Sequence, residues 1–197
     1  AQAKRVLAMA DDHYLLYRSP DVFHGVAGWG MAQLKFFLAT HDSAYLEAAR
    51  RAGAFLVESR ETDPESGGCF WSNPEGIAAG YAHGASGVAM FLLYLHMASR
   101  DEVFLAVGKQ ALDWVIAQGF DDPRGGMTWM VRDRTRSYTP YWRWGSSGIG
   151  RVLLRYWHAT GETRYADLID RIHVGSNHKY TIFPGYFFGT AGIVEMY

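Results

Sequence analysis

The sequence predicts an all-α fold in which helical hairpins follow one another in tandem. Four Gly-x-x-Gly motifs begin at Gly25, Gly84, Gly145 and Gly189. In the first three units an acidic residue follows the second glycine by fourteen positions, and an aromatic residue follows the first glycine by twenty. A register kept three times is typical of a repeat architecture. The acidic residues are Asp42, Asp101 and Glu162, and the aromatic residues are Tyr45, Phe104 and Tyr165.

Each unit reads as two helices with different surfaces. The first helices, over residues 29–38, 88–97 and 149–157, are apolar nearly all round, as a buried inner helix should be. The acidic residue that recurs in each repeat is predicted to mark the start of a second helix, because acidic side chains favour helix N-termini. The second helices carry one apolar face. The pattern therefore predicts an inner and an outer layer of helices.

Long connections join the predicted hairpins. Residues 61–80 and 119–141 are rich in turn-forming residues, and 127–131 is predicted to form one strand of a small hairpin. Connections of this length commonly form a functional rim. The motif glycines indicate either a close approach of two backbone segments or a positive φ at each helix entry.

Composition limits the classes of function. Hydrophobic residues make up 49% and aromatic residues 15% of the chain, which allows a sizeable core. The net charge of −1 and the lack of a basic stripe disfavour nucleic acid. The single Cys69 excludes an internal disulfide. With no signal peptide and no apolar run of membrane length in the sequence, we expect a cytoplasmic location and no membrane partner.

The four motifs, in order, resemble the cyclase domain of the lanthionine synthetase (LanC-like) family. That resemblance implies an α/α toroid, and residues 1–197 are then part of one such domain, with about three hairpins and the start of a fourth. It extends over essentially the whole chain. Residues 21–28 resemble the family's Asp-Val-x-x-Gly-x-x-Gly, residues 80–87 its Gly-[Phe/Leu]-Ala-His-Gly-x-x-Gly, residues 142–148 its Trp-Cys-x-Gly-x-x-Gly, and residues 187–192 its Cys-His-Gly-x-x-Gly.

The sequence departs from the family at its zinc ligands. Zinc-dependent members supply Cys, and then Cys-His, from the third and fourth motifs, where this chain has Arg143, Phe187 and Phe188. Arginine does not serve as a ligand and phenylalanine has no donor atom, so no metal and no zinc cofactor are expected. This pattern resembles the class III synthetases, which fuse lyase and kinase domains to a cyclase domain without zinc. ATP or GTP and Mg²⁺ are then expected only for the fused kinase, outside this segment.

The family reaction adds a cysteine thiol of a precursor peptide to dehydroalanine or dehydrobutyrine, forming a thioether ring. It needs a thiolate, and then an acid for the resulting enolate. The resemblance places His83 at the acid/base position and Asp21 at a carboxylate that orients it. From its charge alone, Arg143 is a candidate to stabilise the thiolate or the enolate.

Each candidate has a structural alternative. His83 can be a hydrogen-bonded structural histidine, Asp21 a turn residue, and Arg143 part of a structural ion pair. His24 is interpreted as structural. A set of aromatic residues before the motif glycines can line a cavity for peptide side chains or pack in the core. This set comprises Tyr81, Trp142, Trp144, Phe187 and Phe188.

Two other functions remain open at this point. A degenerate cyclase fold can hold the precursor peptide while fused domains do the chemistry, which the lost zinc ligands favour. A more remote alternative is a carbohydrate-active α/α toroid, which needs a pair of carboxylates across a cleft. Asp121 and Asp122 are the candidates for that pair.

Overall fold

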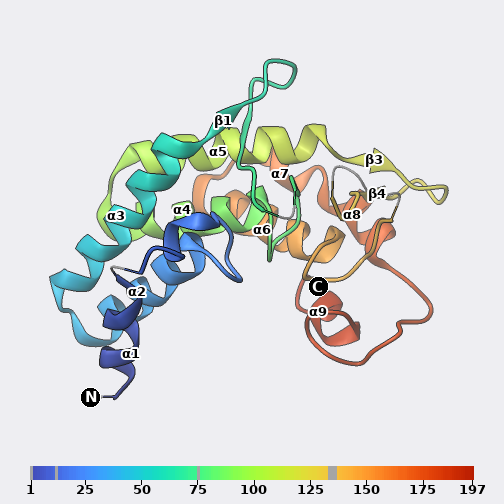
Figure 1. Cartoon of the computed structure of the whole chain (residues 1–197). Helices are drawn as coiled ribbons and strands as arrows, with labels where there is room; N and C mark the ends of the chain where they lie inside the picture. The colour runs from blue at the N-terminus through green and yellow to red at the C-terminus, as the bar shows by residue number, and fades with distance from the viewer. Residues whose placement is uncertain (1, 12, 75, 133–136) are drawn as a thin grey trace.

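A computed structural model describes residues 2–11, 13–74, 76–132 and 137–197. Within these ranges, a helix begins at each Gly-x-x-Gly motif, as the sequence predicts. Helix α2 contacts α4, α4 contacts α6, and α6 contacts α9, so the motif helices form successive members of one inner layer (Figure 1). These helices are α2 (Val26–Thr40), α4 (Ala85–Ser99), α6 (Ser146–Thr160) and α9 (Thr190–Val194).

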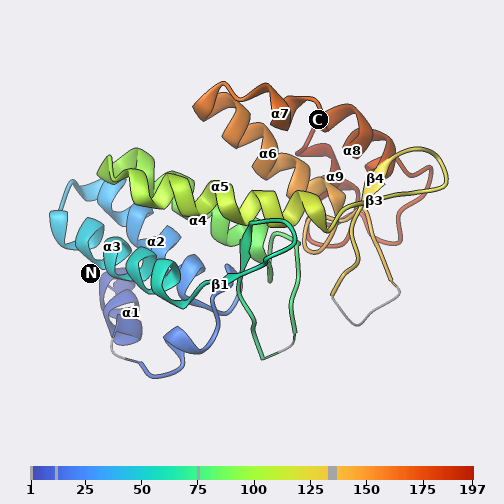
Figure 2. The ribbon, with the colours of Figure 1, turned by 90° about the horizontal axis from the view of Figure 1, so that it is seen from above.

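An outer layer covers the inner helices. Helix α3 (Ser43–Ser59) packs on α2, and α5 (Glu102–Ala117) packs on α4 (Figure 2). The Asp42 and Asp101 side chains cap these two helices, each accepting a 3.1 Å hydrogen bond from a backbone N–H two residues on. The third outer helix is divided into α7 (Thr163–Ala166) and α8 (Ile169–Ser176), both against α6.

The inner helices differ in how far they are buried. Nearly every residue of α4 over 85–95 is buried, in agreement with the prediction of helices that are apolar all round. That prediction is wrong for α6, which carries the exposed Arg155 and the half-buried Arg151. Arg151 pairs with Glu195 at 3.1 Å, so α6 places charge on the side that faces the end of the chain.

The motif glycines allow two backbone segments to approach closely. The first glycine of each motif is the helix N-cap and has an extended φ, between −116° and −158°, so no left-handed conformation is involved. A Cβ atom added at any of the eight motif glycines would collide with the carbonyl oxygen six residues earlier. For the second glycines, these oxygens belong to Val22, Tyr81, Trp142 and Tyr186.

The turns that precede the inner helices are joined to one another by their backbones. The N–H of Phe23 donates to the carbonyl of Ala82 at 3.1 Å, and the N–H of Ala82 donates to the carbonyl of Arg143 at 2.9 Å. The N–H of Arg143 donates in turn to the carbonyl of Phe187 at 3.2 Å. Each of these residues lies two positions before the first glycine of its motif, so the repeat brings the equivalent positions of all four units into one row.

Short elements complete the described chain. Helix α1 (Gln2–Asp11) and the 3-10 turn η1 (Leu16–Arg18) precede α2. Strand β1 (Glu61–Thr62) pairs with β2 (Cys69–Phe70), and β3 (Phe120–Asp121) pairs with β4 (Met127–Thr128), both antiparallel.

The predicted hairpin is confirmed, but β4 is shorter than the predicted 127–131 strand. Trp129, directly after β4, is fully buried, and its indole N–H donates to the carbonyl of Val115 at 2.7 Å. Over the described ranges, no helix combines the length and apolarity needed to cross a membrane.

Candidate functional site

In the row of joined turns, the side chains that precede the motif glycines form two groups, which differ in their position relative to the first glycine. Among the residues three positions before the first glycine, Tyr81 and Trp142 belong to the core. Tyr81 and Trp142 are 6% and 7% exposed, and their ring centroids lie 4.4 Å apart. Tyr186 continues this stack, 4.8 Å from Trp142. The structure therefore gives Tyr81 and Trp142 a packing role, which was one of the two interpretations of the sequence.

Residues one position before the first glycine form a second row, which contains the candidate site. The ring of His83 stacks on Trp144, with centroids 4.3 Å apart and planes at 24°, and lies 5.0 Å from the ring of His24. Phe188 holds the same position in the fourth motif, and Phe187 precedes it. Both phenylalanines are substantially exposed, at 39% and 42%.

Three of the predicted site residues form one hydrogen-bonded line. His83 Nδ1 lies 3.0 Å from Asp21 Oδ2, and Arg143 Nε donates to His83 Nε2 at 3.0 Å. Because arginine can only donate, Nε2 is the acceptor, and Nδ1–H is then the donor to Asp21. Asp21 and His83 are 3% and 2% exposed. The structure thus brings Asp21, His83 and Arg143 together from three different motifs.

The carboxyl of Asp21 is held in its charged form. Burial raises its pKa, but the hydrogen bond to His83 and one from the backbone N–H of His24 outweigh burial, so the pKa lies below the ordinary value of 3.8. The His24 N–H donates to Asp21 Oδ1 at 2.6 Å, so both carboxylate oxygens are bonded. A buried, charged carboxylate fixes the imidazole beside it.

This lowered pKa predicts how Asp21 affects stability. Its stabilising contribution is present at pH values above 3.8 and is lost as the pH falls through the lower pKa of the folded state, because protonation removes the favoured charged form. We expect Asp21→Asn to be less stable than the wild type at neutral pH, with a difference that shrinks as the pH falls below 3.8. Urea unfolding at a series of pH values measures this. A constant difference across the series would show that the Asp21 charge does not stabilise the fold.

Aromatic rings surround the guanidinium of Arg143. Its Cζ atom lies 5.0 Å from the ring centroid of Phe23, 5.2 Å from that of Trp144 and 5.0 Å from that of Phe188. Such rings stabilise a cation through their negative faces. In the described contacts Arg143 bonds to a neutral imidazole rather than to a carboxylate, so the structural ion pair considered from the sequence is not what holds it.

His24 belongs to this site although the sequence interpretation treated it as structural. Its side chain is exposed, and it lines a cleft of about 230 Å³ together with Asp21, Arg18 and Pro74. The signal that could have found it is its register, because His24 and His83 both stand immediately before the first glycine of a motif.

Two sets of residues can be tested as metal ligands. The positions of the family's zinc ligands, Arg143, Phe187 and Phe188, offer no ligand atom. Asp21, His24 and His83 each place one ligand atom within 4.8 Å of the others. A divalent cation there would displace one of the two hydrogen bonds of His83, to Asp21 or to Arg143, and would lie close to the guanidinium of Arg143. The charge of Arg143 therefore opposes a metal at this cluster.

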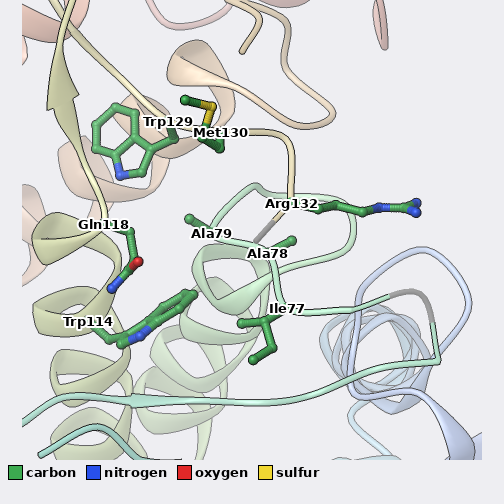
Figure 3. Close-up of a pocket in the computed structure, with 8 residues that line it drawn as sticks. All are labelled: Ile77, Ala78, Ala79, Trp114, Gln118, Trp129, Met130 and Arg132. Atoms are coloured by element: carbon green, nitrogen blue, oxygen red, sulfur yellow. The ribbon is translucent and has the colours of Figure 1, made fainter. Parts of the chain in front are cut away.

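A small pocket lies between the two long connections, at the end of helix α5. Its volume is about 140 Å³, and Trp114, Trp129 and Gln118 form one side of it (Figure 3). Arg132 also lines this pocket but extends away from the other side chains, and its Cζ lies 4.7 Å from the ring centroid of Trp144. The guanidinium of Arg132 thus contacts Trp144, which stacks on the ring of His83, outside the pocket itself.

The acidic pair considered for carbohydrate chemistry has structural partners. The Asp122 carboxylate accepts hydrogen bonds from Arg124 Nε at 3.1 Å and from the backbone N–H of Gly126 at 3.0 Å. Asp121 forms an ion pair with Arg171. Both carboxylates therefore have structural partners around the β3–β4 hairpin.

Solved structures with a similar arrangement of helices establish the fold class. Nisin cyclase superposes with a TM-score of 0.65 at 14% identity, over 88% of this chain and 44% of that one. D-mannose isomerase gives 0.62 at 17% identity, over 83% and 47%. A family 76 glycoside hydrolase (mannosidase) from Bacteroides thetaiotaomicron gives 0.60 at 15% identity, over 82% and 45%. The described helices thus have the arrangement of an α/α toroid, and the chain spans less than half the length of these proteins.

Sequence comparison adds the family. Among curated proteins, none matches the chain. The family model described as "Lanthionine synthetase C-like protein" matches residues 2–197, which is nearly the whole chain. The motifs on which the resemblance rests are those that start the inner helices and carry Asp21, His83 and Arg143. The chain therefore belongs to the lanthionine synthetase C-like family.

Proposed function

We propose that this chain is part of a cyclase that adds cysteine thiols of a precursor peptide to dehydroalanine or dehydrobutyrine without zinc. The observation that carries this proposal is the buried Asp21–His83–Arg143 line, which places an acid/base group and a cation next to each other. Family membership supports a cyclase-type activity. The product of each addition is a thioether ring of the lanthionine type.

In the proposed reaction the three residues have separate roles. Asp21 holds the His83 imidazole in one tautomer and orientation. Arg143 supplies the positive charge, which stabilises the thiolate and then the enolate formed when sulfur attacks the β-carbon. His83 can exchange protons at Nε2 only after the guanidinium turns away towards the bound anion, because Arg143 occupies that nitrogen.

The proposal extends to the context of the chain. The zinc positions of the family carry Arg143, Phe187 and Phe188, which favours a class III synthetase with fused lyase and kinase domains outside this segment. Nucleotide and Mg²⁺ then serve the kinase alone, and the reaction takes place in the cytoplasm. The pocket of about 140 Å³ lined by Trp114, Trp129 and Gln118 is the proposed place for a side chain of the precursor peptide.

The metal-free part of this proposal predicts the result of a simple measurement. The complete protein is expected to contain no stoichiometric zinc and to cyclise a dehydrated precursor peptide at the same rate after treatment with a chelator. Elemental analysis measures the metal, and thiol alkylation followed by mass spectrometry measures the rings. Stoichiometric zinc whose removal stops ring formation would contradict the prediction.

One observation favours the binding-module alternative. Both ring nitrogens of His83 are engaged, by Asp21 and Arg143, as in a structural histidine. A peptide-binding module would bind the precursor peptide but leave its thiols free in the same alkylation assay. Ring formation by the complete protein, lost when only this domain is altered, would favour the cyclase.

A further inference from the structure

The geometry of the site raises the question of which group takes the proton of the substrate thiol. A thiol must lose its proton before it attacks. In the described structure neither nitrogen of His83 is open, because Nδ1 bonds to Asp21 and Nε2 accepts from Arg143. Each oxygen of the Asp21 carboxylate already accepts a hydrogen bond, from His83 or from the backbone N–H of His24, and its lowered pKa makes this carboxylate a poor base. The inner part of the site therefore holds no free base among these groups.

The side chain of His24 lies on the open side of the same group. A ring nitrogen of His24 is within 4.8 Å of ligand atoms of both Asp21 and His83. Unlike those two, His24 is exposed, and no side-chain hydrogen bond of its ring is present among the described contacts. It also borders the cleft of about 230 Å³, whose other walls include Leu15, Arg18 and Pro74. A peptide segment can reach His24 from solvent without moving a buried side chain.

We infer that His24 takes the proton of the attacking cysteine thiol, and that this cleft receives the cysteine-bearing segment of the peptide. This inference rests on the proposed function. Nothing in the family motif assigns a role to this position, which the motif leaves variable.

The step is balanced in atoms and electrons. The thiol proton passes to a ring nitrogen of His24, and the sulfur lone pair forms the C–S bond at the β-carbon. The π electrons of the double bond move to the carbonyl oxygen, where Arg143 stabilises the enolate. The proton then returns from the His24 imidazolium to the α-carbon, so no other reactant is needed. Imidazole suits both transfers because it accepts and releases protons near neutral pH.

The test uses His24→Ala in the complete protein, with His158→Ala as a matched control. The control also removes an exposed histidine, from the last turn of α6. His24→Ala keeps the backbone N–H that bonds to Asp21, so the Asp21–His83 geometry is retained. We expect ring formation to fall about 100-fold in His24→Ala, a typical contribution of a general base. We expect the control variant to match the wild type.

Added imidazole distinguishes proton transfer from a merely structural role. Because His24 borders an open cleft, imidazole in the buffer should restore much of the rate of His24→Ala and have no effect on His158→Ala. A wild-type rate in His24→Ala would overturn the inference, as would a slow variant that imidazole does not rescue. The inference would also be overturned if a chelator slowed the wild type as much as the His24→Ala substitution does. That result would indicate a metal bound by Asp21, His24 and His83. If the wild type forms no rings at all, the proposed function itself fails.

Discussion

Replacing His83 with alanine in the complete protein is expected to leave the precursor peptide dehydrated but without rings. The substitution removes the shared partner of Asp21 and Arg143, which leaves a buried carboxylate and a guanidinium with unmet hydrogen bonds. It also removes the imidazole that holds Arg143 in place, so the guanidinium that stabilises the thiolate and the enolate loses its position. We expect ring formation to fall by at least about 100-fold, as on loss of electrostatic stabilisation at a reacting centre, measured by thiol alkylation and mass spectrometry.

Two controls separate this effect from misfolding. Circular dichroism should retain the helical spectrum of the wild type, and His158→Ala, an exposed site on α6, should form rings normally. If His83→Ala folds and still forms rings at the wild-type rate, His83 is structural. The binding-module alternative would then become the better account of this domain.

The second large effect concerns stability rather than chemistry. Gly148→Ala is expected to destabilise the protein by about 3 kcal/mol or more, at the upper end of the range for overpacking. The added Cβ would collide with the carbonyl oxygen of Trp142 and lie 2.9 Å from the Cβ of Tyr81, in the preceding repeat. Neither atom can move without shifting a turn of the row that carries His83 and Arg143.

Gly185→Ala is the matched control for this substitution. A Cβ at Gly185 meets nothing within 4 Å, and its φ is not in the positive range, so we expect little change in stability. Urea unfolding of both variants, followed by circular dichroism, gives the comparison. Equal stabilities for Gly148→Ala and Gly185→Ala would show that close backbone approach is not the reason for the motif glycines.

The register of the repeats made most of the fold predictable from local rules. Apolar helices after the motifs, acidic caps at Asp42 and Asp101, and one apolar face on each outer helix are all local patterns. Two features depart from these patterns. Arg151 and Arg155 interrupt the apolar surface of α6, and the third outer helix is broken between α7 and α8.

The candidate site was predictable only in part. The motifs identify Asp21, His83 and Arg143 as residues of interest, but not that Arg143 bonds to the imidazole of His83. The aromatic residues before the glycines were predicted as one group, whereas in the structure their surroundings depend on how many positions they stand before the first glycine. Tyr81 and Trp142 stack in the core, while Trp144 and Phe188 flank the histidine and the arginine. The sequence interpretation of His24 as structural did not foresee that its ring lies 5.0 Å from that of His83, because the two histidines belong to different motifs.

The sequence by itself determined the helical hairpins, their inner and outer layers, and the family, because periodicity and motif spacing are properties of neighbouring residues. Only the tertiary structure decided which side chains meet. The backbone hydrogen bonds from Phe23 to Ala82, Arg143 and Phe187 join segments that are distant along the chain. That row places Tyr81 and Trp142, three positions before their glycines, in the core, and places His83 and Trp144, one position before, in the site. A difference of two positions along a turn changes the direction of a side chain, and the packing of successive repeats determines which partners it meets: Tyr81 meets Trp142, and His83 meets Trp144.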